Sequence, residues 1–438
     1  MHLFDTPIST GSLVLLVVAL LIARGFEFVN AFHDTANAVA TVIYTRSLRP
    51  WIAVILSGCL NLLGVYLGGI VVAMSIIKLL PVELLSASGA GEALPWCSRC
   101  SSPPSCGTNL GTWWLGLPAS SSHTLIGAIV GVGLANSLMP GHVFGSGVNW
   151  HKVREIGMSL LVSPIFGLGA AALLLLLARN ILLKSPALHQ PADPNKTPPL
   201  WIRGILVTTC SGVSFAHGSN DGQKGVGLVM LILIGLLPAD FALNASLSKS
   251  QIQDTVAVAE RLETHTREVF GGQSERVASN EPGVPQRTPA GDVITDLGEI
   301  RAALNGKESV QSIPADSRFD LRTRIMRVVN QLAALEKTVK AVPARLADIK
   351  KGAGGSPSSI DYAPGWVIGL IALALGIGTM IGWKRIVVTV GENIGKTHLT
   401  CAQGASAEIV AMTTIGLSGW FGLPVSTTHV SRRASPGR

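Results

Sequence analysis

The sequence has little charge. Lys, Arg, Asp and Glu together make up 14% of its 438 residues, whereas 48% of the residues are hydrophobic. An average soluble domain carries roughly 25% charged residues, so this composition excludes an ordinary soluble protein and favours one that folds in a lipid bilayer. The sequence also lacks a basic run interleaved with aromatic residues, which excludes the usual pattern of nucleic-acid binding.

Cysteines are few and scattered, and no cleavable leader is recognisable. The cysteines imply no disulfide framework; they are Cys59, Cys97, Cys100, Cys106, Cys210 and Cys401. The middle three have C-x2-C-x5-C spacing without an obvious fourth ligand, which matches structural zinc sites poorly. A small-residue cleavage site is missing near the N-terminus and the chain runs on into further apolar segments, so we expect no signal peptide.

Long apolar segments recur on both sides of one polar stretch. They predict an all-α, polytopic membrane protein, since about 20 apolar residues cross a bilayer. Ser12–Ala23 is short for a crossing and continues through polar residues into Ala36–Tyr44, so we expect a helix broken between the two. The other apolar runs are Trp51–Leu80, Gly157–Ala178, Gly204–Phe215, Val226–Ala239, Pro364–Trp383 and Ala405–Leu423.

The polar stretch Asp240–Tyr362 holds 16 acidic and 16 basic residues, so the net charge of +8 belongs to the rest of the chain. Excess Lys and Arg mark cytoplasmic loops, and we place the proline-rich linker 183–200 on that side. Within the stretch, apolar residues at helical spacing predict helices over Gln251–Phe270 and Asp320–Ile349, while Gly271–Pro289 is predicted to be disordered. We interpret the stretch as a cytoplasmic loop; a catalytic or sensory domain is the alternative.

Two polar motifs interrupt the apolar runs. They are Gly25-Phe-Glu-Phe-Val-Asn-Ala-Phe-His-Asp-Thr-Ala-Asn-Ala38 and Ser214-Phe-Ala-His-Gly-Ser-Asn-Asp-Gly-Gln-Lys-Gly-Val-Gly227, here called the first and second acid motifs. Each places an aspartate among small residues. An ionisable side chain at membrane depth costs roughly 2.5–3.5 kcal/mol, so these acids need a functional or pairing role.

A second pair of segments indicates that the chain is duplicated. Gly116-Leu-Pro-Ala-Ser-Ser-Ser-His-Thr124 and Gly422-Leu-Pro-Val-Ser-Thr-Thr-His-Val430, the first and second hydroxyl motifs, share the pattern G-L-P-x-S-S/T-S/T-H. Acid and hydroxyl motifs alternate along the chain, as expected of a repeated unit. The motif aspartates lie 187 positions apart and the motif prolines 306, a difference of 119 positions that the polar stretch accounts for. We therefore divide the chain into a first repeat (1–182), the linker (183–200), a second repeat in two parts (201–239 and 364–438) and the polar loop between those parts (240–363).

The hydroxyl motifs have the composition of an anion site. Leu-Pro followed by three hydroxyl residues suits the first turn of a half-helix in the membrane, where free backbone N–H groups and hydroxyls point at one spot. Broken helices in opposed repeats build transporter sites in this way. Ordinary helix capping by Ser120 and Ser426 is the alternative. The candidate ligands are Ser120, Ser121, Ser122, Thr124, Ser426, Thr427 and Thr428.

The acid motifs supply hydrogen-bond acceptors. Hydrogen phosphate can donate a hydrogen bond to a carboxylate and sulfate at neutral pH cannot, so Asp34 and Asp221 favour the former. With Asn37 and Asn220, these carboxylates could also hold a coupling cation, or a divalent metal that the substrate brings, without forming a fixed metal site. The alternative for each aspartate is a helix cap or a buried pair, for which Lys224 is one partner.

Other ionisable residues are candidates for carrying a coupling proton. Glu27 and Glu408 lie in apolar surroundings, where a buried carboxyl can take up and release a transported proton. A structural ion pair is the alternative for each. His33 is a third candidate, and also a possible ion-pair partner of an aspartate. The remaining motif histidines could relay protons or be structural; they are His123, His217 and His429.

These four motifs in this order resemble the Pit family of inorganic phosphate transporters, most closely its bacterial low-affinity members, over about Phe4 to Val430. The resemblance implies symport of inorganic phosphate with protons, as a neutral metal–phosphate complex, by alternating access of two inverted repeats in the bacterial inner membrane. It implies no enzymatic activity and no cofactor. The implied partners are phosphate, the coupling cation, Mg²⁺ or another divalent metal, lipid and, in a homodimer, a second copy. Sodium coupling is the nearest alternative, and many family members have Asn where this chain has His33.

Two other classes of function remain open at this point. A membrane-embedded hydrolase could pair Ser121 with His123, or Thr427 with His429, although residues two apart on a helical turn do not face each other. A phosphate sensor would use the polar stretch as its output domain.

Two segments depart from the pattern. Gly91–Thr108 reads GEALPWCSRCSSPPSCGT where the duplication calls for an apolar helix, and the chain ends in SRRASPGR where the first copy continues with Leu125–Leu138. Both gain Ser, Arg, Pro or Cys abruptly, as out-of-frame reading of a GC-rich gene would produce. We hypothesise a compensated frameshift over residues 93–108 and a truncating one after Val430, which resequencing of the gene tests.

Overall fold

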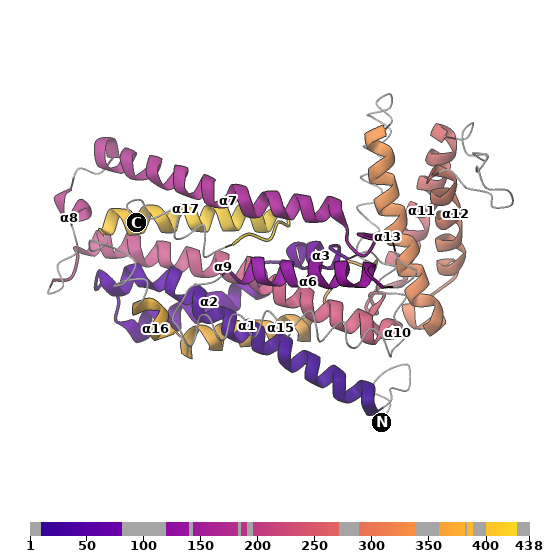
Figure 1. The fold of residues 1–438 in the computed structure, drawn as a ribbon, viewed down its shortest axis with the longest axis horizontal. Helices are drawn as coiled ribbons and strands as arrows, with labels where there is room; N and C mark the ends of the chain where they lie inside the picture. Colours follow the sequence, from indigo (N-terminus) through magenta and orange to yellow (C-terminus); the bar gives the residue numbers. More distant parts are fainter. Residues whose placement is uncertain are drawn as a thin grey trace. The chain divides into compact units, whose positions relative to one another are not determined.

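The computed structural model describes residues 10–80, 120–139, 143–182, 185–190, 196–270, 289–338, 359–381, 383–388 and 400–426. The three cysteines of the poor zinc match, the frameshift segments and all of the predicted disordered segment except Pro289 lie outside these residues. The regular elements within the described ranges are helical, which confirms the all-α prediction (Figure 1). The described residues form a larger unit, drawn from 13–232 and 363–426, and a smaller unit, drawn from 10–12 and 233–362.

Apolar helices make up the larger unit. Three helical stretches are long and apolar enough to cross a membrane, and they cover Leu13–Tyr44, Pro50–Leu67 and Trp150–Asn180; the apolar helix Gly365–Ile381 is shorter. The full set is α1 (Thr10–Tyr44), α2 (Pro50–Leu67), α3 (Val71–Ile77), α6 (Ser121–Ser137), α7 (Trp150–Leu177) with a π-helical end at Ala178–Leu182, α8 (Pro186–His189), α9 (Leu200–Leu236), α15 (Gly365–Ile381), α16 (Trp383–Val388) and α17 (Cys401–Trp420).

The predicted break in the first helix is wrong. The helix α1 runs without interruption through the first acid motif, and α9 runs in the same way through the second. Neither helix contains a proline, so no backbone N–H is missing from the ladder. Two polar side chains of α1 bond within the helix, since the Thr35 hydroxyl donates to the Ala31 carbonyl at 2.6 Å and the Asn30 amide to Glu27 at 3.3 Å. Polar residues within reach of such partners need not end a helix.

A break does occur in the apolar run Trp51–Leu80. The helix α2 ends at Leu67 and α3 begins at Val71, with Gly69 between them at a positive φ of 78° that favours glycine. Gln223 of the second acid motif satisfies the backbone on both sides of this break. Its amide donates to the Gly68 carbonyl at 2.8 Å, and its carbonyl oxygen accepts from the Val72 N–H at 2.7 Å. The interruption is therefore fixed to α9, two residues after the motif aspartate.

The helices α1 and α9 pack in opposite directions. Glu27 of α1 lies against Gly225 of α9, where an added Cβ would be 2.4 Å from the Glu27 Cγ. Twenty positions later in the chain, just after the end of α1, the Ser47 carbonyl accepts from Arg203 Nε at 3.1 Å, and Arg203 lies near the start of α9. The later residues of one helix therefore face the earlier residues of the other.

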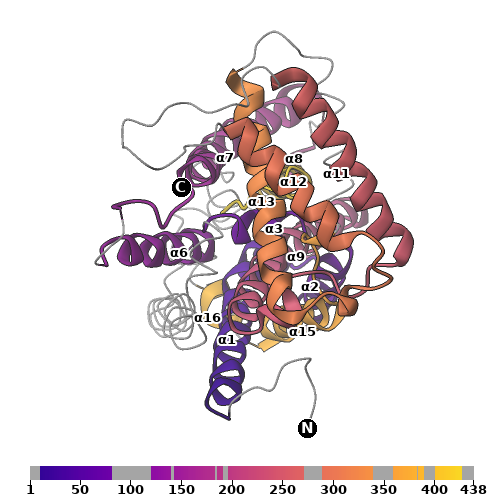
Figure 2. The ribbon, with the colours of Figure 1, turned by 90° about the vertical axis from the view of Figure 1, so that its right-hand side faces the viewer.

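The smaller unit contains a three-helix arrangement. The three helices are α11 (Lys249–Phe270), α12 (Pro289–Leu304) and α13 (Ala315–Thr338), and the short α10 (Pro238–Phe241) precedes them. The middle helix α12 packs against both α11 and α13 (Figure 2). Leu262, Leu297 and Ile325 line the apolar interior that the three helices share. The predicted helices over Gln251–Phe270 and Asp320–Ile349 correspond to α11 and to α13 as far as Thr338, whereas α12 was not predicted.

A buried arginine holds the two ends of the smaller unit together. The Arg322 side chain of α13 is 1% exposed, and its Nη1 donates to the carbonyls of Ala242 and Ile360, each at 2.9 Å. Burial lowers the pKa of Arg322 to about 10, and the nearby Asp361 opposes that shift, so the guanidinium stays charged at neutral pH. It therefore acts as a charged donor that ties the segment after α10 to the segment after α13.

Arg322→Met should destabilise the smaller unit by roughly 2–4 kcal/mol, because two buried carbonyls lose a charged donor. The measurement is the rate of limited proteolysis within 233–362 in the purified full-length protein, which should rise at least about tenfold. Arg327→Met is the control, since Arg327 is 40% exposed and its ion pair with Asp296 spans 3.2 Å. Equal proteolysis rates for the two variants would contradict a structural role of Arg322.

Candidate functional site

The two hydroxyl motifs meet although they are 306 residues apart in sequence. Ser120 precedes the first residue of α6, and its hydroxyl shares a 2.8 Å hydrogen bond with the hydroxyl of Ser426. The Ser122 hydroxyl donates to the backbone carbonyl of Val425 at 2.7 Å. All four residues are buried. Each motif therefore contributes hydroxyls to one buried place, and Ser120 also caps α6 by accepting from the His123 N–H at 3.4 Å.

The second acid motif reaches the same place from α9. Asp221 is 0% exposed, and its Oδ1 accepts a short hydrogen bond from Lys224. The other carboxylate oxygen, Oδ2, has no hydrogen-bond partner among the described residues, and the nearest basic nitrogen recorded for it is His217 Nδ1 at 3.8 Å. A buried carboxylate oxygen without a donor is costly, so Oδ2 is available to a donor or a cation that enters the site.

Asn220 holds the second hydroxyl motif in position. Its side-chain amide donates to the Leu423 carbonyl at 3.2 Å and to the Ser418 hydroxyl at 3.4 Å. The chain turns there, with Gly422 at a positive φ of 69°. The Asn220 side-chain oxygen is buried and has no hydrogen-bond partner in the described part of the chain. The Asn220 amide group therefore positions the second hydroxyl motif, and the Asn220 side-chain oxygen remains as an unused hydrogen-bond acceptor.

Lys224 joins three of the four motifs. Its ammonium donates to Asp221 and to the Ser122 hydroxyl through short hydrogen bonds, and to the Val425 carbonyl at 3.0 Å. Sequence reasoning treated this lysine only as a structural partner of the aspartate. The signal that could have identified it is its spacing, because residues three apart on a helix lie on one face.

The first acid motif contributes Glu27 to this neighbourhood. Glu27 is 0% exposed and packs against Gly225, the residue after Lys224. Asp34 and His33 lie in the continuous α1, and their side chains are outside the described part of the structure. Asn37 is half-buried on the same helix.

Several other candidates are placed differently. The Thr124 hydroxyl donates to the Ser120 carbonyl at 2.9 Å within its own helix, and His123 Nδ1 lies 2.7 Å from the Ser120 hydroxyl rather than at Ser121. Ser121 is buried in the first turn of α6. Thr427, Thr428 and His429 are outside the described residues.

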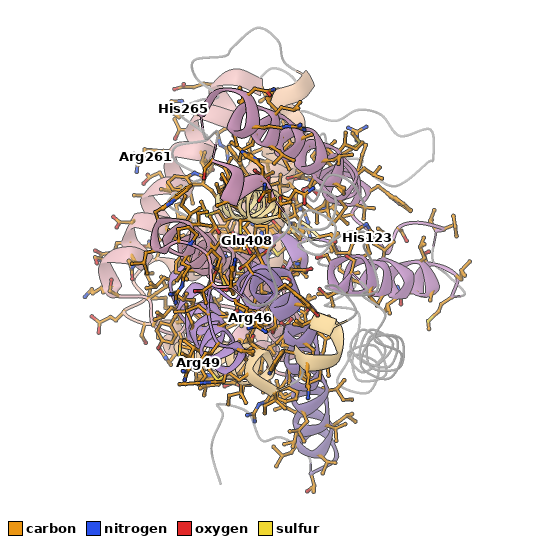
Figure 3. All side chains as sticks on the ribbon, turned by 90° about the vertical axis from the view of Figure 1, so that its left-hand side faces the viewer. Arg46, Arg49, His123, Arg261, His265 and Glu408 are labelled. Carbon is orange, nitrogen blue, oxygen red and sulfur yellow. The ribbon has the colours of Figure 1, made fainter. Side chains whose placement is uncertain are left out.

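Glu408 forms a separate buried site. It is 3% exposed and accepts a short hydrogen bond from the Thr209 hydroxyl of α9, while Thr41 of α1 lies beside it. Ten residues of α17 separate Glu408 from Ser418, a rise of roughly 15 Å. Figure 3 labels Glu408 among the helices and labels His123, an exposed residue of α6. The Glu408 carboxyl is therefore not part of the site where the two hydroxyl motifs meet.

The arrangement can bind an oxyanion that carries a proton. Hydroxyls from two motifs and an ammonium can donate hydrogen bonds, while Asp221 Oδ2 and the Asn220 oxygen can accept them. Within the described residues, no group of three or more His, Cys, Asp or Glu side chains could hold a metal ion. The geometry therefore matches a ligand with both acceptor and donor oxygens.

Comparison with known proteins places this geometry in a family context. A family described as "Phosphate transporter family" matches residues 30–437. The low-affinity inorganic phosphate transporters PitA and PitB of Escherichia coli K12 are 42% and 40% identical to the chain, each over 98% of the chain and 90% of the relative. A counterpart from Buchnera aphidicola is 38% identical over 98% of the chain. A solved structure titled "The sodium-dependent phosphate transporter" has a TM-score of 0.51 and 18% identity, over 96% of this chain and 88% of its own.

Proposed function

Since the chain belongs to the phosphate transporter family, we propose that it imports inorganic phosphate with protons, as a neutral metal–phosphate complex, by alternating access of two inverted halves. The family assignment itself means that the protein is a phosphate transporter and not an enzyme, and its apolar helices agree with a membrane protein. The coupling, the form of the substrate and the transport cycle are the proposal.

One observation carries the proposed substrate site. The Ser120–Ser426 hydrogen bond joins the two halves of the duplication, and Lys224 links this junction to Asp221. Hydroxyls and an ammonium that converge at the start of a helix favour an anion, and the free Asp221 oxygen favours an anion that brings a proton or a metal. Phosphate meets both conditions.

The course of α1 and α9 supports an inverted arrangement of the repeats over a parallel one. These helices carry the equivalent acid motifs and run antiparallel, with Glu27 at Gly225 and Ser47 at Arg203. Equivalent helices related by an axis in the membrane plane run in opposite directions. The Glu27–Gly225 contact pairs the third residue of the first acid motif with the twelfth residue of the second, as an antiparallel arrangement of the two motifs requires.

Glu408 is our first candidate for the coupling proton, with Glu27 as the second. Glu408 lies on α17 and is bonded to Thr209 on α9, and Thr41 of α1 flanks it, so a change in its charge would act on three helices. Glu408→Gln should lower proton-driven uptake at least about tenfold and leave phosphate binding in place. Glu155→Gln, which alters an exposed carboxyl on α7, is the control. Unchanged pH dependence of uptake in the Glu408 variant would remove this residue from the coupling.

Uptake of radiolabelled phosphate into proteoliposomes tests the proposal as a whole. External pH, sodium and magnesium are varied independently, and sulfate is added as the competitor. We expect uptake to follow the proton gradient, to need a divalent metal and to resist sulfate. Uptake that follows sodium and ignores the proton gradient would establish the sodium-coupled alternative.

The two remaining alternatives make different predictions in the same assay. If the protein is a phosphate sensor, residues 240–362 are its output domain and its function depends on them. Phosphate uptake that is retained after deletion of residues 240–362 would exclude the sensor alternative. A hydrolase would alter the labelled compound, which recovery of intact phosphate would exclude. Of the two pairings that a hydrolase could use, Ser121 with His123 disagrees with the structure, in which the histidine contacts Ser120; Thr427 and His429 lie outside the described residues.

A further inference from the structure

Lys224 lies at the centre of the site, and its position is not explained by helix packing alone. An ammonium carries three N–H donors and no acceptor, and Lys224 has three acceptors, namely Asp221, Ser122 and the Val425 carbonyl. The side chain is 1% exposed. All of its donors are therefore used, and they reach the second acid motif and both hydroxyl motifs.

The charges of the site are balanced within it. Lys224 is the one lysine or arginine in the four motifs, and it is bonded to Asp221 three residues earlier on α9. The pair has no net charge, so the lysine gives the site little attraction for an anion while the aspartate holds it. An anion that contacts the ammonium must weaken this pair.

We propose that Lys224 is the residue that binds the oxyanion, and that Asp221 determines which oxyanions can use it; this inference rests on the proposed function. An oxyanion that takes hydrogen bonds from Lys224 leaves the buried Asp221 carboxylate without full compensation, which is costly. Hydrogen phosphate compensates by donating its own O–H to the carboxylate, and a metal bound to phosphate compensates by its charge. Sulfate at neutral pH has no proton to donate. The Asp221–Lys224 pair thus selects oxyanions that carry a proton or a metal.

The proposal predicts a gain of binding. In Asp221→Asn the Lys224 charge is uncompensated, so the purified full-length protein should bind radiolabelled sulfate at least about tenfold more tightly than wild type in equilibrium dialysis. In the double variant Asp221→Asn/Lys224→Gln this gain should disappear. The double variant places two amides at the pair and leaves no uncompensated charge in the interior. The matched control is Lys152→Gln/Glu155→Gln, which alters an exposed pair with the same i, i+3 spacing. It should change neither the sulfate affinity nor the phosphate affinity.

The outcomes separate this inference from the proposed function. If Asp221→Asn gains no sulfate binding, or if the gain persists in the double variant, Lys224 does not bind the anion.

A second pair of variants tests the same role with Asp221 intact. Lys224→Arg should keep the phosphate affinity within about tenfold of wild type, whereas Lys224→Met should lower the phosphate affinity at least about tenfold. Equal phosphate affinities of these two variants would again overturn the proposal. If wild type itself binds no phosphate, the proposed function fails, whatever the variants do.

Discussion

Asp221→Asn should reduce phosphate uptake to roughly 1% of the wild-type rate or less, since breaking a buried charge pair costs about 3–5 kcal/mol. Asp221 is fully buried and accepts a hydrogen bond from Lys224. Asparagine has nearly the same shape but no charge, so it can neither balance the ammonium nor hold a cation. The measurement is the initial rate of radiolabelled phosphate uptake into proteoliposomes that contain equal amounts of folded protein. We expect Asp34→Asn, in the first acid motif, to abolish uptake as well.

The control for this prediction is Glu155→Gln. Glu155 pairs with Lys152 at 3.0 Å with the same three-residue spacing, but on the exposed side of α7. An exposed ion pair contributes about 0–1 kcal/mol, so this variant should transport at close to the wild-type rate. A wild-type rate for Asp221→Asn would refute the assignment of Asp221 to the substrate site.

Much of the site was predictable because its residues are repeated. The two hydroxyl motifs share seven of eight pattern positions as identical or hydroxyl residues, and repetition indicates a common place even though it carries no distances. The structure places Ser120 against Ser426, one from each copy. Asp221 was predictable for the same reason, since Asp34 is its counterpart in the first acid motif.

The residues that sequence reasoning missed are those without a counterpart in the other copy. Lys224 and Gln223 occur in the second acid motif, and the corresponding positions of the first motif, Asn37 and Ala36, are of different types. A comparison of the copies therefore gave no weight to them. Only the fold shows that Lys224 reaches Ser122 and that Gln223 bonds the break between α2 and α3.

Helix continuity was mispredicted because polar composition was read as a break. The ends of an α-helix are set by the backbone, through proline, glycine at positive φ or a capping side chain. The first acid motif has none of these in its interior, and α1 continues through it. The break that the structure does contain lies at Gly68–Ile70, inside a run that hydropathy alone treats as uniform.

The second large effect is expected from Gly218→Ala. Gly64 of α2 and Gly68 directly after it lie against α9 at Phe215 and Ser219, and Gly218 and Gly222 of α9 lie against Asn61 and Val65 of α2. A G-x-x-x-G pattern in each segment thus lets the two backbones approach closely. A Cβ on Gly218 would be 2.1 Å from the Asn61 carbonyl oxygen, a backbone atom that cannot move without its helix. The two helices must separate, and overpacking of this kind costs about 1–3 kcal/mol or more.

Gly218→Ala should therefore lower both the yield of folded protein and the uptake rate per folded molecule at least about tenfold. The loss of rate has its own cause, because Asp221 and Lys224 lie on the same helix as Gly218. A shift of α9 away from α2 moves this pair relative to Ser122, to which Lys224 is bonded. Gly204→Ala on the same helix is the control, since a Cβ there meets no atom within 4 Å and alanine favours a helix by about 1 kcal/mol over glycine. Folding is measured by size-exclusion chromatography and thermal melting, and transport by phosphate uptake. If both alanine variants behave alike, close approach of α2 and α9 does not position the site. If only Gly218→Ala fails, the glycine pattern is what holds Asp221 at the junction of the two repeats.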